Sequence, residues 1–196
     1  MWACHTGGRA YYDASLTCQY VRGIVVGGRQ ATEGPAVSLS YPVANDHQLA
    51  RLLQIGMVLE EVIEARAGKH YETLGEDERD EEVETLLEHA ATESARHRGE
   101  LEALIDALDA DPVAYEEIEQ LVAARYESDT DTDGVLYDQL ANEETAYKFY
   151  DDLIEAIEGS SVEFTIERET LLDTLREIRA DEKAGVEDVT QLMETR

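Results

Sequence analysis

From Asn45 to residue 196, apolar residues recur at intervals of three and four positions almost without interruption. This spacing keeps them on one face of an α-helix, and no stretch shows the strict apolar–polar alternation of a half-buried strand. Pro112 is the only proline after residue 42, so little in this part of the chain breaks a helix. The pattern therefore predicts an all-α fold.

Cap and turn residues divide this pattern into four long helices and one short helix. Asn45 and Gln48 can form a capping box at the first helix. Asp111 and Pro112 provide an N-cap and a first-turn proline for the short helix. The long helices are expected at about 45–74, 77–109, 134–158 and 166–196, and the short one at about 112–126. This order predicts a four-helix bundle with one long crossover that carries a short extra helix.

Residues 1–44 differ in composition from the rest of the chain. Only Asp13 and Glu33 of the 45 acidic residues lie there, together with both cysteines and the only tryptophan. The segment lacks the basic region and apolar core of a signal peptide. We expect a weakly ordered N-terminal extension at 1–44, for which a start codon assigned too early is one origin. We expect the folded domain at 45–196.

The formal net charge of −29 excludes whole classes of partner. A general nucleic-acid binder needs a basic face, and an anionic membrane surface would repel this chain. No run of eighteen apolar residues predicts a membrane span. Only Lys69, Lys148 and Lys183 are lysines, and many carboxylates with few lysines are typical of halophilic proteins that work near molar salt. We expect a halophilic, cytoplasmic protein; an ordinary acidic protein is the alternative.

Each long helix carries a carboxylate within its apolar stripe. The polar residues in the stripes are Glu60 and Glu64 in the first helix, Glu93 and His97 in the second, Glu143 in the third and Glu182 in the fourth. Burying a carboxylate without a partner is costly, and a bound cation would offset that cost for all four helices. Carboxylates with an imidazole suit iron or manganese. The alternative is that some of these groups lie at helix edges in water.

Two of the predicted helices share the pattern ExxAxxxY. It is formed by Glu64, Ala67 and Tyr71 in the first helix and by Glu143, Ala146 and Tyr150 in the third. This pattern resembles the rubrerythrin branch of the ferritin-like superfamily, over residues 47–193. The resemblance implies a ferritin-like bundle with two iron ions, since in that family the following helices add ligands in ExxH motifs. The metal ligands that it implies are Glu64, Glu93, His97, Glu143 and Glu182.

The sequence departs from the family pattern at two positions. Gly185 stands where the last helix should have a histidine, and Ser94 stands three residues before His97, with Glu93 one place away. Glu93 and His97 are still one helical turn apart and can share a metal ion. One metal position is therefore well supplied with ligands, and the second is depleted.

The first helix leaves one assignment open. The motif favours Glu64, but the distance from the turn near Gly75 places Glu60 closer to the level of Glu93. Glu60 is therefore the substitute ligand. Tyr71 and Tyr150 are expected in the core, with their hydroxyl groups near the carboxylates.

The resemblance implies a non-haem di-iron oxidoreductase that oxidises Fe(II) with peroxide or oxygen. The rubredoxin-like iron domain of the full-length family is absent, so an external electron donor would be needed, and a homodimer is one assembly that fits. Two alternatives stay open at this point. One is a non-catalytic interaction or structural bundle with a degenerate metal site, and the other is a cage-forming ferritin that stores iron.

Overall fold

The computed structural model describes residues 42–73, 80–115, 117, 118, 120 and 134–195. Over these residues the chain forms four long helices and no strand. The helices are α2 (Asp46–Thr73), α3 (Glu81–Asp106), α5 (Val135–Glu158) and α6 (Arg168–Glu194). The predicted all-α four-helix bundle is therefore confirmed. Of the expected short helix, residues 112–114 are not helical, whereas the described residues 115, 117, 118 and 120 are, so the predicted start at Asp111 and Pro112 is too early.

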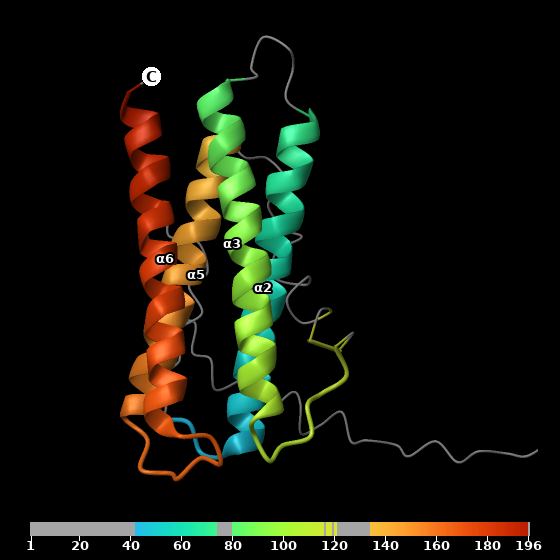
Figure 1. Cartoon of the computed structure of the whole chain (residues 1–196), viewed down its shortest axis with the longest axis vertical. Coiled ribbons are helices and arrows are strands. Elements are labelled where there is room, and N and C mark those ends of the chain that lie inside the picture. The colour runs from blue at the N-terminus through green and yellow to red at the C-terminus, as the bar shows by residue number, and fades with distance from the viewer. Residues whose placement is uncertain (1–41, 74–79, 116, 119, 121–133, 196) are drawn as a thin grey trace, which may run out of the picture.

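The four helices lie side by side along the long axis of the molecule (Figure 1). The most extensive packing is between α2 and α3 and between α5 and α6, so the bundle consists of two helix pairs. The packing between α3 and α6 is much less extensive. The end of α3 and the start of α5 lie at opposite ends of the bundle, as the predicted long crossover requires. None of the described helices combines the length and the apolar character that a membrane crossing needs.

Polar caps fix the starts of the first two helices. Asn45 Oδ1 accepts a hydrogen bond from the Gln48 backbone N–H at 2.8 Å. Gln48 Oε1 in turn accepts one from the Ala44 backbone N–H at 2.8 Å, one residue before the usual partner of a capping box. Asp80 caps α3 by accepting from the Glu82 N–H at 2.8 Å, so this helix begins later than the predicted Asp77.

The chain joins the core before the predicted boundary at residue 44. Val43 is 1% exposed, and its N–H donates to the Ala156 carbonyl at 3.1 Å. The Ser160 hydroxyl donates to the Val43 carbonyl at 2.6 Å. Residues 42–44 therefore pack against the end of α5, whereas residues 1–41 of the expected extension lie outside the described residues.

The apolar core is divided into two clusters along the bundle axis. The larger one fills the half in which α3 ends and α6 begins, and a small one around Ala67, Val83 and Leu87 lies towards the other end. Between them, buried polar side chains face one another. This polar layer contains the candidate site.

Candidate metal centre

Three side chains from three helices meet in the polar layer. Glu60 from α2, His97 from α3 and Glu182 from α6 each offer one ligand atom, and these atoms all lie within 4.8 Å of one another. The three residues are 0%, 1% and 4% exposed. His97 Nδ1 lies 2.9 Å from Glu182 Oε1 and 3.6 Å from Glu60 Oε2. Bonds of about 2.0–2.2 Å to one ion separate neighbouring ligand atoms by about 3 Å, so the three residues can share an ion.

Helical spacing carries these side chains into the core. Leu101 follows His97 by four positions on α3, and Ile178 precedes Glu182 by four positions on α6. Both apolar residues are 0% exposed. Because residues four positions apart share a helix face, packing of the apolar side chains directs the polar ones inward as well.

Two of the ligand atoms lack the hydrogen bonds that buried polar groups normally make. Glu60 Oε2 and His97 Nδ1 are buried and have no hydrogen-bond partner among the described residues. Glu182 Oε1 lies 2.9 Å from Nδ1, close enough to pair with a protonated imidazole. An unsatisfied buried polar group costs about 1–3 kcal/mol. A cation would engage both atoms, and carboxylates with an imidazole suit iron or manganese, so the residues present fit a metal ion.

The outer nitrogen of His97 faces a charged pair. His97 Nε2 lies 3.4 Å from Asp181 Oδ2 and 3.0 Å from Arg96 Nη2, and Arg96 also binds Asp181 at 2.5 Å. An Nε2–H that donates to Asp181 leaves the Nδ1 lone pair free for a metal ion. An Arg96 N–H that donates to Nε2 instead leaves the proton on Nδ1. The pair therefore accommodates both tautomers.

Burial and charge shift the pKa values in the polar layer. Burial lowers the pKa of His97, but the carboxylates of Glu182 and Glu60 outweigh it and raise the value to about 10. The pKa of Glu182 lies well above its ordinary value, chiefly because burial disfavours the charged form. The pKa of Glu143 is raised to about 7, again chiefly by burial. Glu182 and Glu143 therefore hold a proton more tightly than they would in water, unless a cation replaces the proton.

Two neutral side chains orient the carboxylates. The Tyr150 hydroxyl donates to Glu60 Oε1 at 2.5 Å, which confirms the expected approach of this tyrosine to the carboxylates. The side chain of Tyr71 lies outside the described residues. Gln139 is 0% exposed and donates from Nε2 to Glu143 Oε1 at 2.6 Å. Gln139 was not predicted from the sequence, although it precedes Glu143 by one helical turn.

Glu143 lies beside the triad and occupies space that Gly185 leaves open. The residue is 6% exposed, and Glu182 is close enough to form a hydrogen bond with it. A Cβ atom placed on Gly185 would overlap Glu143 Oε2. The carboxylate of α5 thus fills the position in which a side chain of α6 would begin.

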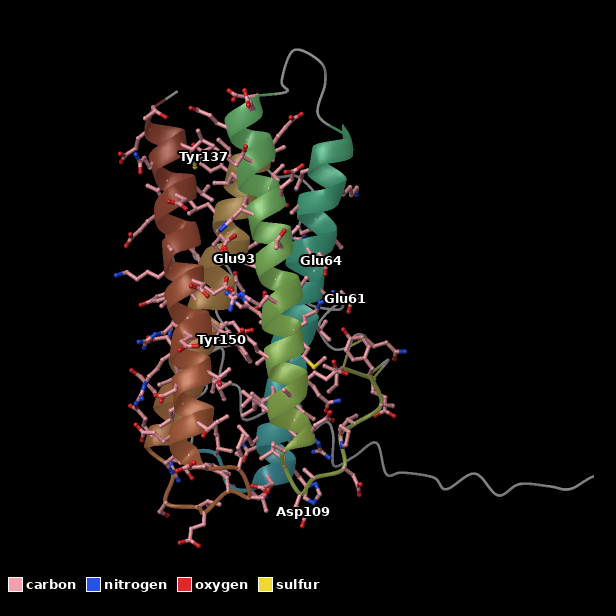
Figure 2. The ribbon with its side chains drawn as sticks, viewed as in Figure 1. Glu61, Glu64, Glu93, Asp109, Tyr137 and Tyr150 are labelled. Carbon is pink, nitrogen blue, oxygen red and sulfur yellow. The ribbon has the colours of Figure 1, made fainter. Side chains whose placement is uncertain are left out.

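Glu64, which the motif favours as a ligand, lies outside the cluster. Its side chain is 37% exposed and binds Arg98 Nη2 at 2.5 Å. The substitute, Glu60, provides the α2 carboxylate instead. The two glutamates are one turn apart, and only the earlier one is level with His97. In Figure 2, Glu64 is seen on the side of α2 and α3 away from α6.

Glu93 lies at the edge of the site rather than within the triad. Its side chain is 25% exposed and pairs with His89 Nδ1 at 3.0 Å. Its pKa is raised, chiefly by burial, although His89 lowers it. Figure 2 shows Glu93 between α3 and α6. Ser94, three residues before His97, is 3% exposed and offers a hydroxyl group in place of a carboxylate.

A cleft of about 490 Å³ opens along the seam between α3 and α6. Its walls are Thr85, Leu86 and Ala90 of α3 and Asp188, Val189 and Leu192 of α6, among others. Glu143 of α5 and Gly185 also line it, so the cleft borders the polar layer.

Comparisons with protein-family models, curated proteins and solved structures find no match to this chain. The resemblance to rubrerythrins, which rests on the short motifs, therefore stays a prediction.

Proposed function

We propose that this bundle binds a transition-metal ion, iron or manganese, in its core. The observation that carries the proposal is the convergence of Glu60, His97 and Glu182 from three helices, with two buried ligand atoms that lack hydrogen bonds. A cation would remove the cost of those two atoms and the repulsion between the carboxylates. Metal binding would therefore also stabilise the fold.

A second ion, as in a rubrerythrin-like di-iron protein, would depend on Glu143 and Glu182, with Glu93 at the edge. This position has no histidine, because Gly185 stands where the family motif has one. Hard oxygen ligands bind first-row metals without an imidazole, but fewer protein ligands give a weaker site. We therefore expect one tighter ion and one weaker ion.

The resemblance to rubrerythrins suggests a redox function for such a centre. Bound iron would supply electrons for the reduction of peroxide or oxygen, with an external donor to restore Fe(II). The chain would hold the ion through two carboxylates and one imidazole and keep bulk water away. Tyr150 would fix the orientation of Glu60 through its hydrogen bond.

A second function is favoured by the charge of His97. With a pKa of about 10, this histidine is protonated at neutral pH and can balance the carboxylates without a metal ion. Ser94 and Gly185 fit the same interpretation, because neither can act as the ligand of the family motif. The protein would then be a non-catalytic bundle with an interaction or structural role.

Anaerobic titration with Mn(II) and Fe(II) distinguishes the two functions. We expect tight binding of at least one ion per chain, and for His97→Ala an affinity weaker by at least about 100-fold, because a direct ligand exceeds the 10–100-fold effect of outer-shell groups. His47→Ala is the control, since His47 is exposed on α2. A native protein that binds neither metal, or a His97→Ala variant that binds as well as the native protein, would favour the non-catalytic bundle.

A further inference from the structure

The candidate ligands are too deeply buried for an ion to reach them directly from solvent. Glu60, His97 and Glu182 are 0%, 1% and 4% exposed. An ion that exchanges with solvent therefore needs an entry path through the bundle. The helix pairs pack most extensively within themselves, so a seam between the pairs is the natural place for such a path.

The α3–α6 cleft has the position and the charge for this role. Glu143 lines the cleft and is only 6% exposed. It also lies within hydrogen-bonding reach of Glu182. Glu82, Glu93 and Asp188 add carboxylates to the walls. None of the described residues that line the cleft is lysine or arginine. An acidic cleft with apolar walls concentrates cations and excludes anions.

We propose that this cleft is the route by which a divalent cation enters and leaves the core, with Glu143 as the first buried carboxylate that it meets. This inference rests on the proposed metal-binding function. The glycine at position 185 is part of the route, because a side chain there would meet the Glu143 carboxylate. Glu143 would then pass the ion to Glu182, which is its neighbour and a member of the triad.

A matched pair of threonines on α3 tests the route by steric block. Thr85 lines the cleft, and Thr92 does not. Both are exposed and donate their hydroxyl group to the carbonyl four residues earlier, at 2.7 and 2.8 Å. Thr85→Trp should slow both association and dissociation of Co(II) by about tenfold or more without a change in Kd, because a barrier acts on rates alone. Thr92→Trp should leave both rates at native values. Anaerobic stopped-flow absorbance of Co(II) gives the rates, and circular dichroism checks the fold.

A second pair tests the charge of the route. Asp188 is exposed at the cleft, whereas Glu177 is exposed on α6 outside it. Asp188→Lys and Glu177→Lys change the net charge equally. Only Asp188→Lys should slow association by about tenfold, and added salt should reduce the difference, because salt screens exposed charges.

The outcomes separate the route from the function. Native rates in both Thr85→Trp and Asp188→Lys, with Co(II) still bound at equilibrium, would overturn the route and leave the metal site standing. A native protein that binds no Co(II) at equilibrium would overturn both. Slowed exchange in the two cleft variants, with native exchange in the two controls, supports the route.

Discussion

The choice between Glu60 and Glu64 can be decided by changing each glutamate to glutamine. The two residues lie one turn apart on α2, but their surroundings differ. Glu60 is 0% exposed, accepts a hydrogen bond from Tyr150 and lies 3.6 Å from His97 Nδ1. Glu64 is partly exposed and pairs with Arg98. Each substitution keeps the side-chain shape and removes one charge, so the pair isolates the position of the charge.

The structure predicts a large loss of Mn(II) affinity for Glu60→Gln and none for Glu64→Gln. Glu60→Gln removes a ligand charge in the core and should weaken Mn(II) binding by at least about 100-fold, which corresponds to about 2.7 kcal/mol. Tyr150 can still donate to the amide oxygen, so the fold should survive. Glu64→Gln removes one partner of a partly exposed ion pair, a change of about 0–1 kcal/mol in folding stability. Its Mn(II) affinity should equal that of the native protein.

Equilibrium Mn(II) titration under anaerobic conditions, with urea unfolding of the metal-free proteins, measures both effects. The contrast in affinity is the decisive quantity, since the net charge is the same in the two variants. If Glu64→Gln loses Mn(II) binding while Glu60→Gln retains it, the geometric assignment is refuted and the assignment from the ExxAxxxY motif is correct.

The remaining predictions concern pH and salt. The pKa of Glu143 rises from 4.5 to about 7 and that of His97 from 6.5 to about 10, so the folded metal-free protein binds more protons than the unfolded chain. Its free energy of unfolding should therefore fall as the pH rises from about 4.5 to 10, and in His97→Ala the fall above pH 6.5 should be smaller. Mn(II) affinity should rise over the same range, because the ligands must lose their protons; an affinity independent of pH would contradict the ligand set. With a net charge of −29, the bundle should also melt at a lower temperature in millimolar than in molar KCl, and equal melting temperatures would remove the halophilic interpretation.

The fold could be predicted because its determinants are local. The apolar stripes specify the four helices, and the cap at Asn45 fixes the first start within one residue. The start of α3 was placed near Asp77 instead of after Asp80, because the segment before it offers several acidic residues that can cap a helix. Packing against the core, as for Val43, depends on contacts with distant residues and could not be inferred from composition.

The site could be predicted only in part, because its geometry depends on the relative height of neighbouring helices. His97, Glu143 and Glu182 were identified as polar interruptions of apolar stripes, and the structure buries all three. Glu60 and Glu64 lie one turn apart on α2, and both fall within its apolar stripe. Only the height of α2 relative to α3 selects Glu60 over Glu64. The distance of each residue from the turn near Gly75 points to Glu60, whereas the ExxAxxxY motif points to Glu64.

The absence of a side chain at Gly185 leaves room for the buried carboxylate of Glu143. From the sequence, the glycine marks a missing histidine ligand and a depleted metal position. In the structure, the Glu143 carboxylate lies where a Cβ of residue 185 would be, and Gln139 holds that carboxylate from its own helix. A side chain at this position would have to displace Glu143 Oε2, while Gln139 holds the other oxygen, Oε1. The glycine therefore makes room for the buried glutamate, and both residues line the cleft between α3 and α6.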